Sequence, residues 1–180
     1  MILILNGSPN KDSKSLSIVN EILRSKTEEV VIINAYSQNI FSCDDCKYCT
    51  RIIGCSKSDD MTNIHELLMK ASTLIVSSPI YFGALSDKVL TIINRFQRYY
   101  GQKFDIRDSN IPRLKNLIFV NTAGSKKSRM FNGVKETQWI LSKLFQPENS
   151  LYIHVGETDK NVPLTRKKVI NKINKIRNVL

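Results

Sequence analysis

The sequence predicts an α/β fold in which one five-stranded parallel sheet is covered by helices on both faces. Short apolar runs alternate along the chain with segments of helical periodicity, and turn residues follow each run. The runs are apolar throughout, which is typical of parallel strands buried on both faces. With 180 residues, 42% of them hydrophobic, the chain suits one core, so we expect a single domain over residues 1–180.

The first third of the chain begins with a strand at residues 2–5, which ends at the turn Asn6-Gly7-Ser8-Pro9. Ser13 or Ser15 then caps a helix with one apolar face, because a hydroxyl can accept a hydrogen bond from the open N–H groups of a first turn. A second strand follows at residues 30–33.

The middle of the chain opens with an irregular, cysteine-rich insertion at about residues 40–58. Asp59 or Asp60 then starts an amphipathic helix. A third strand follows at residues 73–77, and a further helix carries apolar residues from Leu85 to Phe96.

The last part of the chain adds two strands, at residues 117–121 and 151–155, separated by a helix around Trp139. A final helix is predicted to open at Pro163, since proline suits a first helical position. The polar stretch from residue 101 to 112 is long enough to form a flap.

Three loops are expected to meet at one edge of this sheet. In doubly wound sheets ligands bind outside the carboxyl ends of the strands. Residues 6–15, 78–84 and 121–126 follow three of the predicted strands directly. We therefore expect a ligand site where these loops converge.

The first of these loops has neither a dinucleotide G-x-G-x-x-G motif nor a G-x-x-x-x-G-K-[ST] motif. It does offer the hydroxyls of Ser8, Ser13 and Ser15 beside a helix N-terminus, where peptide dipoles favour an anion. A terminal phosphate fits here, and an ordinary capped turn is the alternative.

The second loop sets two aromatic residues, Tyr81 and Phe82, side by side before Gly83. A flat heterocycle fits against such rings. The alternative is that the rings only cover the end of the sheet.

All four cysteines of the chain form one C-x2-C-x2-C-x5-C run: Cys43, Cys46, Cys49 and Cys55. A disulfide framework is disfavoured in a chain of this size that is expected to be cytoplasmic. Closely spaced thiolates can hold a [4Fe–4S] cluster or zinc. The residues alone leave a cluster, zinc and reduced free thiols open.

The overall charge is +11, which favours acidic partners. No basic leader and no apolar run of ~18 residues stands out, so we expect a cytoplasmic protein without a membrane partner. No nucleic-acid motif is found. Neither His65 nor His154 has a second ligand or catalytic partner at a suitable spacing, so we expect structural roles for both and single out no catalytic residue.

The chain resembles the flavodoxin-like NAD(P)H-dependent FMN oxidoreductases, a family that includes the iron–sulfur flavoproteins. The resemblance is carried by G-S-P at 7–9, the cysteine run, D-D-M at 59–61 and S-P-I-Y-F-G at 78–83, and it covers roughly residues 1–96. It implies a three-layer sandwich with strand order 2-1-3-4-5, and a homodimer or homotetramer. It also supports a [4Fe–4S] cluster at the four cysteines.

The same resemblance assigns two parts of an FMN site. The residues that it places at the FMN phosphate are Ser8, Asn10, Ser13, Ser15 and Leu16. Those that it places at the isoalloxazine are Pro79, Ile80, Tyr81, Phe82, Gly83, Thr122 and Gly124.

The chain also departs from the family pattern G-S-P-R-x-x-G-N-T. It has Asn10 for the arginine and Ser15 for the threonine, which keeps a hydroxyl, while Lys11 or Lys14 can replace the missing charge. The segment after Thr122 lacks the family's Gly-Gly-rich loop.

Three functions follow as hypotheses. The first is an enzyme, an NAD(P)H-dependent FMN reductase or related flavin oxidoreductase, which takes electrons from NAD(P)H and passes them to a small or protein acceptor. The second is an iron–sulfur flavoprotein electron carrier that exchanges electrons with a ferredoxin, whose acidic surface suits the positive charge. The third is a basic binding module without redox function.

Overall fold

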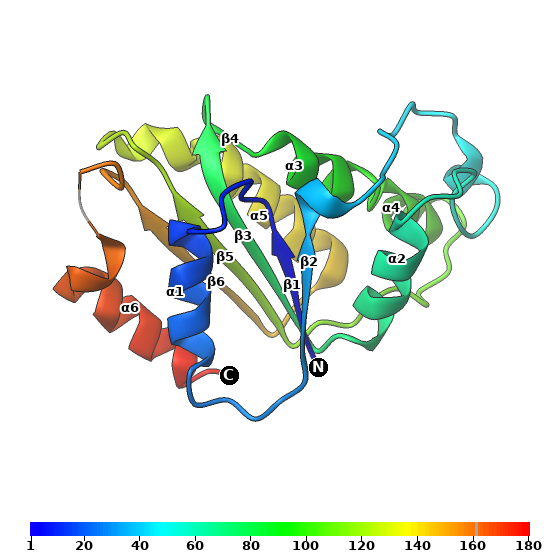
Figure 1. Cartoon of the computed structure of the whole chain (residues 1–180). Coiled ribbons are helices and arrows are strands. Elements are labelled where there is room, and N and C mark those ends of the chain that lie inside the picture. Colours follow the sequence, from blue (N-terminus) through cyan, green and yellow to red (C-terminus); the bar gives the residue numbers. More distant parts are fainter. Residues whose placement is uncertain (161) are drawn as a thin grey trace.

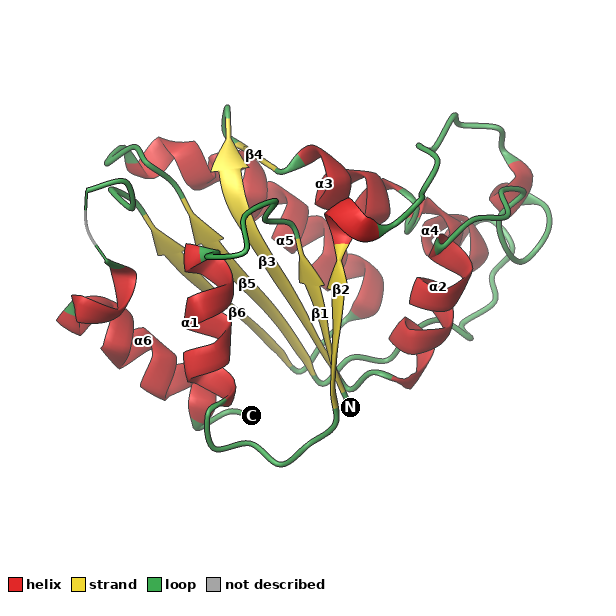
Figure 2. Cartoon of the chain, in the orientation of Figure 1, coloured by secondary structure: helices red, strands yellow, loops and turns green. Residues whose placement is uncertain are grey.

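Five long parallel strands form the sheet, in the order β2-β1-β3-β5-β6 (Figures 1 and 2). The computed structural model describes residues 1–160 and 162–180. The strands are β1 (Ile2–Asn6), β2 (Val30–Asn34), β3 (Thr73–Tyr81), β4 (Ala84–Leu85), β5 (Asn116–Thr122) and β6 (Asn149–Val155). Numbered among the five long strands alone, the order is the expected 2-1-3-4-5, so the predicted fold class is confirmed.

The short strand β4 was not predicted. It pairs antiparallel with the end of β3, after a two-residue turn in which Phe82 and Gly83 both have positive φ, +51° and +83°. Such turns match the right-handed twist of a hairpin. β3 therefore continues past the sheet as a projecting hairpin, which Figure 1 shows rising above the other strands.

Helices cover both faces of the sheet. They are α1 (Lys14–Leu23), α2 (Met61–Lys70), α3 (Asp87–Asn94), α4 (Gln97–Phe104), α5 (Asn132–Phe145) and α6 (Lys167–Arg177). One core lies between the sheet and α1 with α6, and a larger one lies between the sheet and α2, α3 and α5. Figure 1 shows α1 and α6 in front of the strands and α5 behind them.

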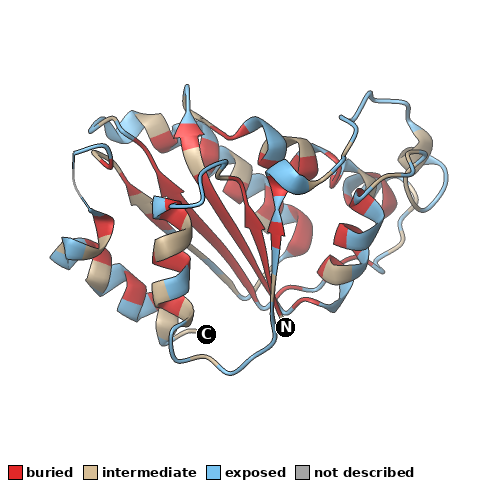
Figure 3. Ribbon diagram, viewed as in Figure 1, coloured by how far each residue is buried: buried red, intermediate tan, exposed pale blue. Residues whose placement is uncertain are grey.

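Alternate residues of the strands supply these two cores. Ile4 and Ile75 belong to the core under α1 and α6, whereas Leu3 and Leu74 belong to the opposite core. All four are fully buried, and Figure 3 shows the strands buried along the middle of the sheet. Burial of each such side chain stabilises the fold by ~1.5–3 kcal/mol, which explains why these strands are apolar throughout.

Three local expectations need correction. The predicted flap from residue 101 to 112 begins inside α4, because Gly101 belongs to that helix. The helix expected over 85–96 is shorter and ends at Asn94, where the chain turns into α4. Pro163 opens a 3-10 turn, and α6 itself begins at Lys167. The helix expected around Trp139 is present as α5, on which Trp139 itself is 58% exposed.

The cysteine-rich insertion leaves the sheet after β2 and returns at α2. It is irregular except for one 3-10 turn, Tyr48–Thr50. Figure 1 shows it as a long cyan loop beside α4, at the edge of the molecule. Among the described residues, no helix has the length and apolar character needed to span a membrane.

Candidate functional site

A cavity of about 170 Å³ lies at the carboxyl edge of the sheet, where the three predicted loops meet. Its walls come from the loops after β1, β5 and β6 and from the end of β3, because β3 runs to Tyr81 and so includes the first residues of the predicted loop 78–84. The lining residues are Ser8, Asn10, Asp12, Ser13, Lys14, Ser15, Pro79, Ile80, Tyr81, Thr122, Ala123, Gly124, Thr158 and Asp159. The convergence of loops 6–15, 78–84 and 121–126 is therefore confirmed.

The loop after β1 is shaped by serine hydroxyls. Ser13 caps α1, because its Oγ accepts a hydrogen bond from the N–H of Leu16 at 3.1 Å. The Oγ atoms of Ser13 and Ser15 lie 3.1 Å apart, and both residues are buried. Lys14 and Ser15 open the helix, so their N–H groups have no intrahelical carbonyl to bond. Hydroxyls and open N–H groups thus gather at one wall of the cavity, as an anion site requires.

The loop after β6 was missed by sequence reasoning. The Lys14 side chain reaches across the cavity and donates its Nζ–H to the carbonyl of Thr158. Gly124 lies next to this loop, since a Cβ there would lie 2.0 Å from the side-chain Oδ2 of Asp159. The only signal in the sequence is Gly156, directly after the last predicted strand, and it does not by itself indicate a site.

The end of β3 is held by a small polar cluster. The Oγ of Ser78 accepts a hydrogen bond from the N–H of Ser86 at 3.0 Å. Gly7 fits against both serines, since a Cβ at Gly7 would lie 2.5 Å from the Oγ of Ser86. These close contacts fix the first two loops relative to each other.

Most of the residues predicted at the FMN site line the cavity together. Ser8, Asn10, Ser13, Ser15, Pro79, Ile80, Tyr81, Thr122 and Gly124 do so. Leu16 lies on α1 and contributes only its capped N–H. Phe82 and Gly83 form the turn of the hairpin outside the cavity wall, and Phe82 is fully exposed.

The residues present fit a bound flavin mononucleotide in chemistry and in place. The serine hydroxyls and open N–H groups suit a phosphate, and the segment Pro79–Tyr81 with Thr122 lines the same cavity, where a flat ring would pack. The carboxylates of Asp12 and Asp159 also border the cavity, so negative charge is not favoured over its whole surface. Lys14 provides the nearby cation.

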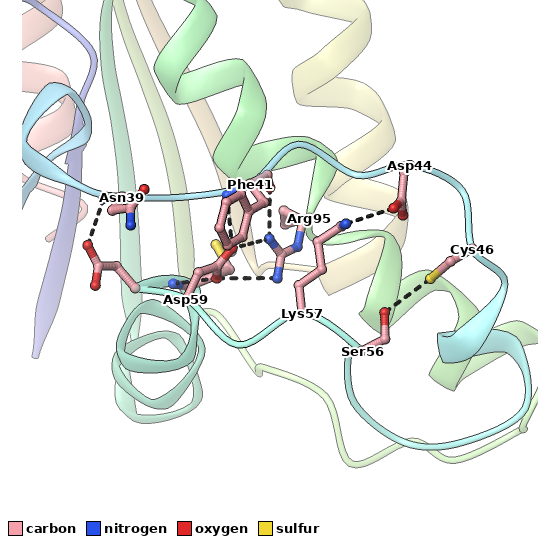
Figure 4. A network of polar contacts seen from close by, with 10 residues as sticks. Asn39, Phe41, Asp44, Cys46, Ser56, Lys57, Asp59 and Arg95 are labelled. Carbon is pink, nitrogen blue, oxygen red and sulfur yellow. Dashed lines mark hydrogen bonds and ion pairs between the residues drawn. The ribbon is translucent and has the colours of Figure 1, made fainter.

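The second candidate site is the cysteine insertion. Polar contacts join its outgoing segment to its returning segment (Figure 4). The Asp44 carboxylate pairs with Nζ of Lys57 at 2.7 Å. Farther along the loop, Sγ of Cys46 lies 3.2 Å from Oγ of Ser56. The outgoing and returning limbs of the insertion are therefore held side by side.

All four cysteines line one cavity of about 40 Å³. The positive side chains in its wall are Lys47, Lys57, Arg95 and Arg98. Soft thiolate donors suit an iron–sulfur cluster or zinc. In the described part of the chain, however, no three His, Cys, Asp or Glu side chains are arranged to hold a metal ion. The cysteines thus share a place and a donor type without a finished coordination geometry.

The cysteines differ in their surroundings. The hydrogen bond with Ser56 lowers the pKa of the exposed Cys46 thiol, and the thiolate is the form that binds metals. Burial raises the pKa of Cys49, which sits on the 3-10 turn against α4. Gly101 of α4 permits this contact, because a Cβ there would lie 2.5 Å from the carbonyl oxygen of Cys49.

The two histidines occupy structural positions. His65 is buried, and its Nδ1 lies 3.0 Å from the hydroxyl of Tyr99. Burial and the nearby positive charge of Arg98 lower its pKa to about 3. His154 stacks on the ring of Phe131, and burial lowers its pKa to about 4. Neither histidine lines the two candidate sites described above.

Comparison with known proteins finds a family match. The model of the NADPH-dependent FMN reductase family matches residues 1–137. An iron–sulfur flavoprotein of Archaeoglobus fulgidus is 30% identical over 96 residues, covering 52% of this chain and 47% of the relative. One from Methanosarcina thermophila is 24% identical over 127 residues, covering 69% and 60%. The chain thus spans about half the length of relatives such as the first.

Solved structures agree on the fold. The NAD(P)H:quinone oxidoreductase from Methanothermobacter marburgensis superimposes with a TM-score of 0.75, covering 99% of this chain and 96% of that one. At 17% identity, the likeness concerns the arrangement of strands and helices.

Proposed function

Because the chain belongs to the NADPH-dependent FMN reductase family, we propose that it binds FMN in the cavity at the carboxyl edge of the sheet. We propose further that it acts as an FMN-dependent oxidoreductase with NAD(P)H as electron donor and a small or protein electron acceptor. One observation carries the proposal: nine of the twelve residues expected at an FMN site line a single cavity there.

The chain's own residues divide the binding of the cofactor. The hydroxyls of Ser8, Ser13 and Ser15 and the first N–H groups of α1 would hold the phosphate, where the helix dipole favours negative charge. Lys14 lies at the same wall and adds a positive charge. These groups fix the end of the cofactor farthest from its reactive ring.

Residues at the end of β3 would position the ring. Bound FMN would supply the redox chemistry, namely hydride transfer from NAD(P)H, giving NAD(P)⁺, and transfer of two electrons to the acceptor. Pro79 and Ile80 form the wall, and Tyr81, 46% exposed, leaves that side accessible to solvent and to a nicotinamide. No acid or base from the chain is needed for hydride transfer.

Substitution of Ser15 tests the phosphate assignment. Ser15→Glu places a carboxylate where the phosphate is expected and should abolish FMN retention on purification. Asn20→Glu is the matched control, because Asn20 lies exposed on the same helix. Flavin absorbance per chain is the measurement, and equal flavin content in the wild type and Ser15→Glu would refute the assignment.

Turnover separates an enzyme from a carrier. The flavin-loaded protein should oxidise NADH or NADPH steadily in the presence of a quinone or free flavin. If the bound flavin is reduced by neither nicotinamide, the oxidoreductase proposal fails.

A second function, that of an iron–sulfur flavoprotein electron carrier, is favoured by the four cysteines around one cavity. Here Cys43, Cys46, Cys49 and Cys55 would hold a [4Fe–4S] cluster, and a ferredoxin would be the partner. The net charge of +11 suits such an acidic partner.

The test is anaerobic purification followed by iron and labile sulfide analysis. Iron and sulfide in the amounts of one cluster per chain, with reduction by ferredoxin but not by NAD(P)H, would support the carrier. A flavin spectrum alone, with neither iron nor sulfide after reconstitution, would contradict it.

A further inference from the structure

The cysteine insertion is closed at its neck by one buried arginine. Nη1 of Arg95 donates to the carbonyl of Phe41 at 2.8 Å and to Oδ2 of Asp59 at 2.6 Å. The same carboxylate accepts a hydrogen bond from the N–H of Phe41 at 2.9 Å. Phe41 precedes the four cysteines and Asp59 follows them, so Arg95 fastens the two ends of the loop to the end of α3 (Figure 4).

The ion pair between Arg95 and Asp59 is fully buried. Both the Arg95 and the Asp59 side chains are 1% exposed. Although burial opposes its charge, the hydrogen bond to Asp59 and the negative charges nearby raise the pKa of Arg95. Its Nε–H is buried and has no hydrogen-bond acceptor, while the side chain lines the cysteine cavity. A buried donor without a partner is costly, and the hydrogen bonds of Arg95 to Phe41 and Asp59 must offset that cost.

The charges around the cavity do not cancel. Lys47 pairs with Asp45, Lys57 pairs with Asp44, and Arg95 pairs with Asp59. Arg98 has no carboxylate within ion-pair distance among the described residues; it lies over the ring of Tyr99, 5.1 Å from the centroid. Its Nε is also buried without a partner. The wall of the cysteine cavity therefore carries one uncompensated positive charge, on Arg98.

We propose that these two arginines are positioning residues for the cysteine site, with divided roles. Arg95 fixes the shape of the loop that presents the cysteines, and Arg98 supplies the positive charge beside them. The inference rests on the proposed iron–sulfur function of this site and names the residues that prepare it.

The two roles predict different effects when each arginine is replaced. The reduction potential of an iron–sulfur cluster depends on nearby charge and on hydrogen bonds to its sulfurs. Loss of Arg98 therefore changes the potential. Loss of the Arg95–Asp59 pair removes no net charge, so it changes the order of the loop and the accessibility of its thiols.

The role of Arg98 is tested in the anaerobically reconstituted protein by iron content, sulfide content and reduction potential. Arg98→Met should keep the iron and sulfide of the wild type and shift the potential to more negative values. Arg98→Lys should restore the potential, because it restores the charge. An unchanged potential in Arg98→Met would overturn this role.

The role of Arg95 is tested without any metal. Each cysteine of the reduced, metal-free protein is alkylated with iodoacetamide, and its rate is followed by peptide mass spectrometry. The double variant Arg95→Met with Asp59→Asn should alkylate at the half-buried Cys49 and Cys55 several-fold faster, with its FMN content unchanged. Arg24→Met, at an exposed arginine on the far side of the sheet, should alkylate as the wild type does.

The outcomes separate the inference from the function on which it rests. If the wild type takes up neither iron nor sulfide, the carrier function fails and the role of Arg98 fails with it, while the alkylation rates still decide the role of Arg95. If the wild type takes up a cluster but the four cysteines of the double variant are alkylated at the wild-type rates, the role of Arg95 is refuted. The carrier function then still stands.

Discussion

Single buried residues decide how this fold responds to pH. His65 is neutral in the folded protein because burial and Arg98 lower its pKa to about 3, far below the ordinary histidine value. Between these two values the unfolded chain binds a proton that the folded chain does not. Stability is therefore fully present near neutral pH and is lost as the pH falls.

Because of His65 alone, we expect the free energy of unfolding to fall by about 2 kcal/mol as the pH falls from about 7 to about 5. The variant His65→Gln should show a correspondingly smaller loss in urea unfolding measured at both pH values. His154, with its pKa lowered to about 4, contributes in the same direction, so some loss should persist. The same loss in the variant and the wild type would contradict the assignment to His65.

The buried ion pair between Arg95 and Asp59 should contribute measurably to stability. Arg95→Met leaves the Asp59 carboxylate buried without its partner, which should cost ~3–5 kcal/mol in urea unfolding. Adding Asp59→Asn removes the stranded charge, so the double variant should recover most of that loss. A double variant that is no more stable than the single one would show that the pair is not coupled in this way.

Local sequence patterns predict most helices and strands but not the contacts between them. The strands and most helices follow from local apolar patterns, and Ser13 was identifiable as a cap because its hydroxyl acts on its own helix. The contact between α4 and the cysteine loop was not, because it depends on residues distant in the chain. Gly101 looked like part of a polar flap, yet it sits inside a helix where only hydrogen fits under the carbonyl of Cys49.

The candidate sites likewise contain some parts that the sequence predicts and others that it does not. The loops after β1, β3 and β5 could be grouped because strand direction alone brings them together. The loop of Thr158 and Asp159 could not, since its place depends on contacts between distant residues, among them the hydrogen bonds from Lys14 to Thr158 and from the N–H of Thr158 to the carbonyl of Ala123. The burial of Arg95 was not predicted, because it becomes visible only when Phe41 and Asp59 are in place.

Gly101→Ala tests the contact between α4 and the loop. Alanine improves an ordinary helix by ~0.5–1 kcal/mol, but here its Cβ would meet the backbone of Cys49 at 2.5 Å. We expect no gain in stability and faster alkylation of Cys49 by iodoacetamide. Asn20→Ala, on the exposed face of α1, is the control that should not alter the thiols. If Gly101→Ala is more stable and alkylates normally, the close contact does not exist in solution.

At the scale of the whole molecule, one short helix joins the two candidate sites. The N–H of Ser86, just before α3, donates a hydrogen bond to Ser78 near the end of β3. Arg95, just after α3, bonds to Phe41 at the start of the cysteine loop. The helix has 8 residues, which correspond to a length of ~12 Å. The sheet thus presents the cavity proposed for FMN at its carboxyl edge and the cysteine cavity at its side, linked by α3.

The proposed oxidoreductase depends on FMN binding through its phosphate in the cavity at the carboxyl edge of the sheet. A titration of flavin-free protein with FMN and, in parallel, with riboflavin, which has the same ring and no phosphate, tests this binding. FMN should bind with one molecule per chain and much more tightly than riboflavin, and Ser15→Glu should remove that preference. Equal affinity for the two flavins, or no binding of either, would show that this cavity does not bind FMN through its phosphate.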